Sequence, residues 1–256
     1  MKTFSFFSEK GGVGKTTLTI FFASYLAYCL NKKVKVIDTE APTFRIKEFR
    51  RTDEALLKSD HPNPLRNYAK ANKLQSRRYD IDCRGCAVNM YTVNERKELV
   101  RSIQKDINDD EYDYELIDFP AGYSENTPIS DIVKNGLLDL VYIPTSTETQ
   151  ERRSAFIVAK QMKSRGQDVR ILWNRINPAY MKCPEILDQA EMQIDSAIGV
   201  QHSKVRIKTF NKATQASDVT CFTRTTVCWP NRYIEMICPE LITLFKEIVS
   251  ILDLKE

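Results

Sequence analysis

Lys10-Gly11-Gly12-Val13-Gly14-Lys15-Thr16-Thr17 (KGGVGKTT) sets the architecture expected of this 256-residue chain. An apolar, strand-like run, Thr3–Ser8, ends just before this stretch, and a helical pattern, Thr16–Leu30, begins within it. The three glycines let the backbone turn so that successive N–H groups point at one centre, and the start of the helix adds its positive dipole end. The stretch therefore predicts a phosphate-binding loop between a strand and a helix.

Each polar side chain of this loop has an expected task. Lys15 is placed to reach the β- and γ-phosphates of a nucleotide, and the Thr16 hydroxyl to bind Mg²⁺. Thr17 is placed to contact the α-phosphate. The predicted nucleotide-binding residues of the loop are Lys10, Gly11, Gly12, Val13, Gly14, Lys15, Thr16 and Thr17.

Strand-like and helical patterns alternate along the chain. The expected strands are Thr3–Ser8, Val34–Asp38, Glu115–Asp118, Leu138–Pro144 and Asp168–Asn174, and the expected helices are Thr16–Leu30, Glu95–Ile107, Glu148–Arg165, Pro184–Ile194 and Arg232–Leu252. This alternation predicts an α/β fold with a mostly parallel central sheet flanked by helices on both faces. Residues 59–94 fit the rhythm poorly. We interpret them as a variable, polar excursion from the sheet within a single domain that spans residues 1–256.

The composition is that of an ordinary globular protein. Hydrophobic residues make up 42% of the chain and charged residues 28%. No window approaches the roughly 18 consecutive apolar residues of a membrane span, and the N-terminus lacks the apolar core of a signal peptide. We therefore expect a cytoplasmic protein. The net charge of +4 permits binding to a polyanion without requiring it.

The loop departs from the general pattern G-x-x-x-x-G-K-[ST] at its start. Glu9 replaces the first glycine, and a second lysine, Lys10, precedes the glycine pair. In this the sequence resembles the deviant Walker A family of P-loop ATPases, which includes the ParA and MinD ATPases and the nitrogenase iron protein. The resemblance implies ATP and Mg²⁺ as cofactors. It also implies a homodimer in which Lys10 reaches across the interface to the other subunit's nucleotide, with Lys10 and Lys15 both serving catalysis.

Val36–Pro42 (VIDTEAP) resembles the family's D-x-D-P-Q stretch. Carried over, Asp38 organises the water shell of the metal, and Glu40 positions the attacking water. The second acid is glutamate instead of aspartate, and the proline comes one residue late, as in ParA-like proteins of Bacteroidetes mobile elements. The alternative for Glu40 is a solvated loop acid, and the longer side chain leaves the rate of hydrolysis open.

Two further stretches complete the resemblance. Glu115–Gly122 (ELIDFPAG) is similar to the family's D-x-P-P-G motif, in which Asp118 would hold an Mg²⁺-bound water, although Asp118 alone would also suit a helix N-cap. Ile171–Pro178 (ILWNRINP) is similar to its adenine-reading motif, with Asn174 on the base and Arg175 nearby. The alternative for Asn174 is a turn residue at the end of a strand.

Three other features of the sequence bear on metal, membrane and DNA binding. Cys83 and Cys86 have half the spacing of a zinc or iron–sulfur site, and a structural role is favoured because no second pair follows. The last helix carries more acidic than basic residues, which favours packing on the sheet over membrane binding. ParA proteins bind DNA through basic residues in their C-terminal part, by counterion release at phosphates. The corresponding basic residues here are Lys204, Arg206, Lys208 and Lys212, for which a solvated face is the alternative.

The resemblance implies a ParA-like ATPase. An ATP-dependent dimer would bind nonspecific DNA, and slow hydrolysis, stimulated by a partner protein, would release it. The cargo would be a plasmid, a chromosome region or a conjugative element. The alternatives are a nucleotide switch that organises a conjugation or polar complex without binding DNA, a metabolic enzyme of the same fold class, and an iron–sulfur carrier.

Overall fold

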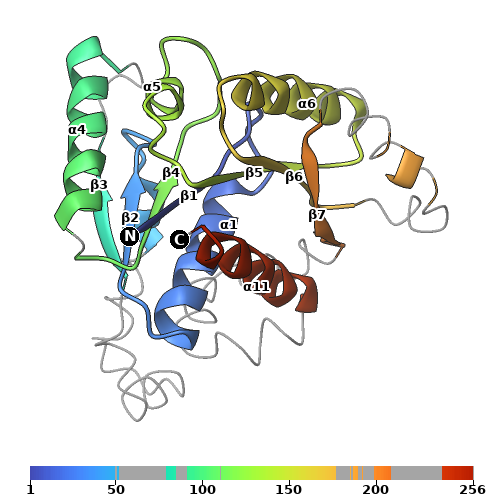
Figure 1. Ribbon diagram of the computed structural model, residues 1–256, viewed down its shortest axis with the longest axis horizontal. Coiled ribbons are helices and arrows are strands. Elements are labelled where there is room, and N and C mark those ends of the chain that lie inside the picture. Colours follow the sequence, from blue (N-terminus) through green and yellow to red (C-terminus); the bar gives the residue numbers. More distant parts are fainter. Residues whose placement is uncertain are drawn as a thin grey trace.

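A seven-stranded, all-parallel sheet organises the protein in the computed structural model (Figure 1). The structure describes residues 1–49, 51, 79–84, 91–109, 111–176, 185, 187–189, 192, 199–208 and 238–255. The strands are β1 (Lys2–Phe6), β2 (Val34–Asp38), β3 (Asp80–Cys83), β4 (Tyr114–Asp118), β5 (Leu140–Thr145), β6 (Val169–Trp173) and β7 (Gln201–Arg206). Their order across the sheet is β3-β2-β4-β1-β5-β6-β7.

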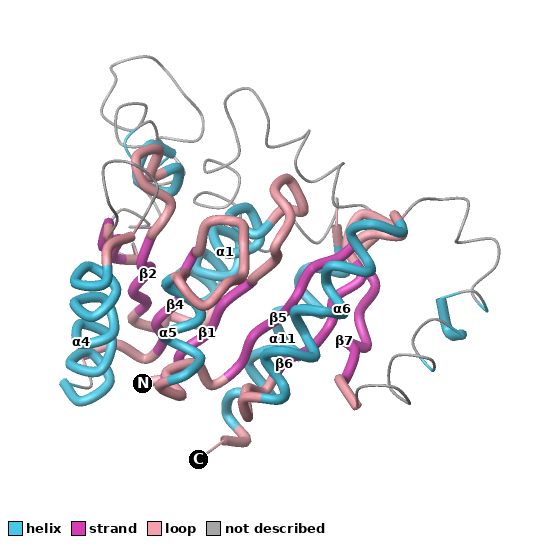
Figure 2. The backbone as a smooth tube through the Cα atoms, turned by 90° about the horizontal axis from the view of Figure 1, so that it is seen from above, coloured by secondary structure: helices cyan, strands magenta, loops and turns pink. Residues whose placement is uncertain are grey.

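Helices cover both faces of the sheet. They are α1 (Lys15–Ser24), which continues into the π-helical turn η1 (Tyr25–Cys29), and α4 (Val93–Asp109), α5 (Pro128–Lys134), α6 (Thr149–Ser164) and α11 (Pro239–Asp253). Figures 1 and 2 show α4, α5 and α6 along one face and α1 and α11 along the other. The predicted fold class is therefore confirmed.

Each face of the sheet has its own hydrophobic core, because side chains alternate along a strand. In β5, Leu140 and Tyr142 enter the core under α1 and α11, whereas Val141 and Ile143 enter the core under α4, α5 and α6. Phe245 of α11 packs on Phe22 of α1, with ring centroids 5.2 Å apart. The last helix thus packs against the body of the protein, as its charge pattern predicted.

The sheet places the phosphate loop at a change of direction in the strand order. From β1 the chain moves to β2 on one side of the sheet, and after β4 it crosses to β5 on the other side of β1. Parallel sheets bind ligands beyond the carboxyl ends of their strands at such a point. The loops after β1, β2 and β4 therefore meet at one edge.

Two strands and a helix were missed by the sequence analysis. Asp80–Cys83 forms the edge strand β3 beside β2, so the interpretation of residues 59–94 as an excursion from the sheet was wrong for this part. Its sequence, DIDC, is half acidic because an edge strand is only partly covered. The other two are β7 and α5. Of the expected helix 184–194, residues 185, 187–189 and 192 are described and are helical, and the rest lie outside the described residues.

Candidate nucleotide-binding site

The phosphate loop has a backbone that only glycine adopts readily. Gly12 and Gly14 have φ angles of 78° and 96°, in the left-handed region. A Cβ atom built on Gly11 or Gly12 would meet nothing within 4 Å, so the loop is open on that side. Helix α1 begins at Lys15, and no side chain caps its N-terminus. Its first N–H groups are therefore available to an anion.

Lys15 is held beneath this loop. Its side chain is buried, with the residue 8% exposed, and its Nζ donates a hydrogen bond of 3.3 Å to the carbonyl oxygen of Lys10. Burial lowers the pKa of Lys15, and the nearby carboxylates of Asp118 and Glu40 oppose that shift. The ammonium group lies where a phosphate cradled by the loop would meet it.

Thr16 and Asp118 form the centre of the candidate metal site. The Thr16 hydroxyl donates to Oδ2 of Asp118 over 2.8 Å. Asp118 is fully buried, and its other oxygen, Oδ1, has no hydrogen-bond partner among the described residues. Burial raises the pKa of Asp118 to about 7, and the charge of Asp38 adds to this shift. A buried carboxylate oxygen without a partner beside a threonine hydroxyl fits a hydrated Mg²⁺ ion.

Asp38 fixes the turn that follows β2. It is fully buried and stands opposite Asp118 in the register of β2 and β4. Its two oxygens accept backbone N–H groups of Glu40 and Ile46, each over 3.1 Å. Burial raises the pKa of this carboxyl group as well. Asp38 therefore touches the loop that carries Glu40 and lies one strand away from the Thr16–Asp118 pair.

Glu40 lies on a turn that other residues anchor. The Thr39 hydroxyl donates to the carbonyl oxygen of Asp118 over 2.7 Å, and the Tyr91 hydroxyl contacts the carbonyl oxygens of Thr39 and Arg84. The Glu40 carboxylate is partly exposed and lies 3.8 Å from the guanidinium of Arg45. Sequence analysis missed Thr39, although it stands between the two acids. It also missed Tyr91, which no local pattern marks.

Asn174 and Arg175 reach the phosphate loop from the end of β6. Asn174 Nδ2 donates to the carbonyl oxygen of Val13 over 2.9 Å, and Arg175 Nη1 donates to that of Gly12 over 2.6 Å. Asn174 is 1% exposed, and its Oδ1 has no hydrogen-bond partner in the described part of the chain. Asn174, which was expected to contact adenine, and its neighbour Arg175 thus hold the loop in place, a role that the sequence did not indicate.

Glu9 and Lys10, the two unusual residues of the loop, lie at its exposed rim. The Ser154 hydroxyl of α6 donates to the Glu9 carboxylate, which joins the loop to that helix. Lys10 presents its carbonyl oxygen to Lys15, and its own N–H donates to the Ser8 hydroxyl over 3.2 Å. The described structure thus brings together the predicted residues from Lys10 to Arg175 at one edge of the sheet.

The remaining predicted residues lie elsewhere. Lys204 and Arg206 are on the edge strand β7, Lys208 follows it, and Lys212 lies outside the described residues. Cys83 is a partly buried free thiol at the end of β3, and Cys86 also lies outside the described residues. Among the residues that the structure describes, no group of three or more His, Cys, Asp and Glu side chains could hold a metal ion.

Comparison with known proteins agrees with this geometry. The model of a protein family described as an AAA domain matches residues 1–149, which is more than half of the chain. The chain belongs to the AAA-domain family. None of the curated proteins searched matches it.

Solved structures show the same fold as this member of the AAA-domain family. A chain of the MinC:MinD cell division protein complex of Aquifex aeolicus superposes with a TM-score of 0.65 at 21% identity, covering 98% of this chain and 96% of that one. A ParA family ATPase from Chlorobium tepidum gives 0.56 at 20%, with 96% of each chain covered. The septum site-determining protein MinD of Pyrococcus horikoshii, solved with Mg-ADP, gives 0.56 at 18%, covering 96% and 95%. The fold is thus that of the MinD and ParA P-loop ATPases, which the sequence resembles.

No helix in the described ranges combines the length and the hydropathy that crossing a membrane requires.

Proposed function

We propose that the protein is a cytoplasmic, ParA-like ATPase. ATP and Mg²⁺ close a homodimer, the dimer binds nonspecific DNA, and slow hydrolysis stimulated by a partner protein releases it. The cargo is a plasmid, a chromosome region or a conjugative element. The observation that carries the proposal is the Thr16–Asp118 pair, which leaves a buried carboxylate oxygen open directly beside Lys15 and the glycine loop.

The residues divide the chemistry among them. The backbone N–H groups of the loop and Lys15 hold the phosphates. Thr16 and Asp118 would hold hydrated Mg²⁺, which would neutralise phosphate charge when bound. Glu40 orients the attacking water, and Asp38 keeps the turn of Glu40 in place through its two backbone hydrogen bonds. The partner subunit's Lys10 stabilises charge that develops on the phosphates.

Two of the similar structures support this reading. The Pyrococcus MinD was solved with Mg-ADP, and the Aquifex chain was solved in a complex with MinC. We infer from these neighbours a nucleotide-dependent protein that works with a protein partner. The adenine role of Asn174 fits the unpartnered Oδ1 atom, because an amide oxygen accepts a hydrogen bond from the adenine amino group.

Gel mobility of random duplex DNA tests the proposal most directly. The DNA is mixed with protein and ADP, ATP or a nonhydrolysable ATP analogue. We expect a shift with ATP and with the analogue, loss of the shift with ADP, and weakening as salt rises. Lys15→Ala should remove ATP binding and the shift together. Binding that is equal with and without nucleotide would contradict the proposal.

The second candidate is a nucleotide switch that organises a conjugation or polar complex without DNA. It is favoured by the carboxylates around the basic strand β7. Arg206 pairs with Asp188 over 2.6 Å, and Glu247 accepts the backbone N–H of Lys204 over 3.0 Å. These acids reduce the positive charge available to phosphates. ATP-dependent dimerisation without any shift of DNA would select this candidate.

A further inference from the structure

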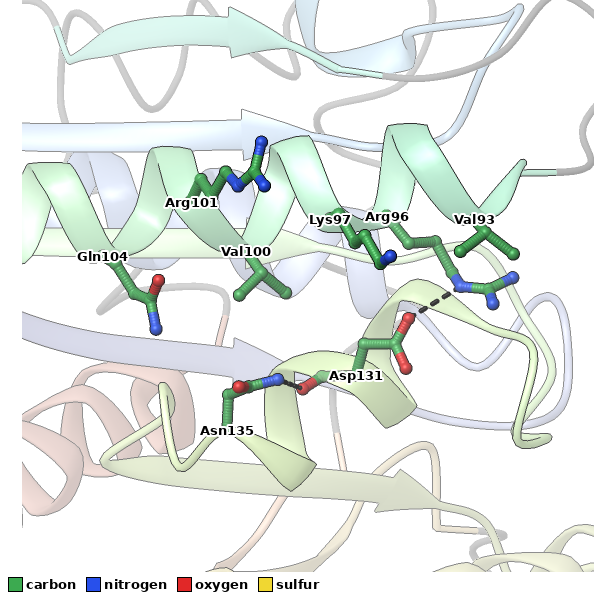
Figure 3. Close-up of a pocket in the computed structure, with 8 residues that line it drawn as sticks. All are labelled: Val93, Arg96, Lys97, Val100, Arg101, Gln104, Asp131 and Asn135. Carbon is green, nitrogen blue, oxygen red and sulfur yellow. Dashed lines mark hydrogen bonds and ion pairs between the residues drawn. The ribbon is translucent and has the colours of Figure 1, made fainter.

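A groove of about 420 Å³ runs between α4 and α5, on the face of the sheet opposite α1 (Figure 3). Val93 and Val100 give it an aliphatic surface, and Val93 is 55% exposed. Lys97 and Arg101, one helical turn apart on α4, also line it and are exposed. Neither cation forms an ion pair with a carboxylate of the described residues. The groove therefore combines apolar surface with two exposed cations that form no ion pair with the described residues.

Arg96 is the buried cation among the residues that line this groove. It is 9% exposed, and its Nε donates to the Asp131 carboxylate of α5 over 2.7 Å, the contact drawn in Figure 3. Its Nη1 donates to the carbonyl oxygen of Asn126 over 2.8 Å and to that of Tyr91 over 3.4 Å. One buried guanidinium thus joins the groove to two backbone segments.

Both segments lead to the candidate nucleotide site. Asn126 belongs to the loop that follows Asp118. Tyr91 contacts the carbonyl oxygen of Thr39 through its hydroxyl and so anchors the turn that carries Glu40. A carboxylate entering the groove would compete with Asp131 for Arg96 and disturb both sets of hydrogen bonds.

We propose that this groove docks an acidic segment of a partner protein, and that Arg96 transmits its occupancy to the loops after Asp118 and Asp38. This inference rests on the proposed function, because the two loops matter for ATP hydrolysis only if the site binds ATP. A polypeptide is favoured over a nucleic acid because valines lie among the cations, which suits a segment that alternates carboxylates with aliphatic side chains. A phosphate backbone needs the cations and leaves the valines unused.

Fluorescence anisotropy with a labelled, amidated peptide of Glu-Leu repeats tests the docking without nucleotide or DNA. We expect salt-sensitive binding that weakens about tenfold in Lys97→Ala/Arg101→Ala, because two partly exposed ion pairs are lost. The matched control is Lys105→Ala/Lys160→Ala, which removes the same charge from exposed helix positions outside the groove and should bind the peptide as the wild type does. A peptide of Lys-Leu repeats should not bind.

Several results would overturn the docking proposal. The first is that the acidic peptide does not bind, and the second is that both double variants bind it with equal affinity. The third is that Lys97→Ala/Arg101→Ala lowers the affinity for duplex DNA or for phosphatidylglycerol vesicles by as large a factor as the affinity for the peptide. The peptide titration needs no nucleotide, so its failure would contradict the docking proposal alone. Failure of ATP-dependent DNA binding would contradict the proposed function alone.

Hydrogen–deuterium exchange tests the relay through Arg96. In the wild type, the peptide should change exchange in residues 119–127 and 39–43. Arg96→Lys keeps the charge but loses the forked hydrogen bonds. It should still bind the peptide and should no longer change exchange in these loops. If thermal unfolding shows that Arg96→Lys is not folded, Asp131→Asn replaces it and should tighten peptide binding. Unchanged exchange in the wild type, or unchanged peptide affinity in Asp131→Asn, would refute the relay.

Discussion

At the scale of single residues, Asp118 is a fully buried carboxyl group in the candidate metal site. Burial raises its pKa from 3.8 to about 7, so the folded protein binds a proton that the unfolded chain releases between about pH 4 and 7. The free energy of unfolding therefore falls as pH rises through this window. We predict that Asp118→Asn raises the free energy of unfolding at pH 8, without Mg²⁺, by on the order of 1 kcal/mol. The same substitution should abolish Mg²⁺-dependent ATP binding. Urea unfolding and nucleotide titration measure the two effects.

Glu115 provides the matched control on the same strand. It is also fully buried, and burial together with the neighbouring Asp106 carboxyl raises its pKa to about 8. Because the raised pKa means that a charged Glu115 destabilises the folded state, Glu115→Gln should raise the free energy of unfolding at alkaline pH. It should leave ATP binding intact, because Glu115 lies three residues before Asp118, on the interior of β4. A Glu115→Gln protein that also lost ATP binding would show that the Asp118 effect is not specific to the metal site.

At the scale of elements, the end of β6 and the phosphate loop are joined by Asn174. We predict that Asn174→Ala weakens binding of inorganic tripolyphosphate about tenfold, because the Val13 carbonyl oxygen loses its hydrogen bond and the loop is no longer held in place. Binding of ATP should weaken further, because the proposed hydrogen bond from the base to Oδ1 is lost as well. Isothermal titration with both ligands measures this. A loss confined to ATP would mean that Asn174 serves the base and does not position the loop.

How far the sequence predicts these elements depends on how local their signals are. The strand–loop–helix unit around Gly12 was predicted because its glycines, lysines and threonines are consecutive in the sequence and form one motif. The edge strand β3 was missed because its acidic residues are tolerated only where one side of the strand is open. Arg96 and Tyr91 were missed because their contacts with Asn126 and Thr39 span 30 and 52 positions and leave no periodic pattern.

At the scale of the whole molecule, the proposed homodimer uses Lys10, at the exposed rim of the loop, to complete the site of the other subunit. Its neighbour Lys15 is turned inward and buried, whereas Lys10 is exposed. We predict that Lys10→Ala binds ATP within about twofold of the wild type, since phosphate binding falls to Lys15 and the loop backbone. It should nevertheless remain monomeric with ATP, where the wild type dimerises. Size-exclusion chromatography with light scattering, in ADP and in a nonhydrolysable ATP analogue, measures this.

The control for Lys10 is Lys105→Ala, which removes an exposed lysine of α4 and should leave ATP-dependent dimerisation unchanged. The two variants separate a specific contact from a loss of net charge, because each lowers the charge by the same amount. If Lys10→Ala dimerises with the analogue as the wild type does, each subunit binds ATP with its own residues alone. The second copy would then have to be recruited through another surface of the molecule.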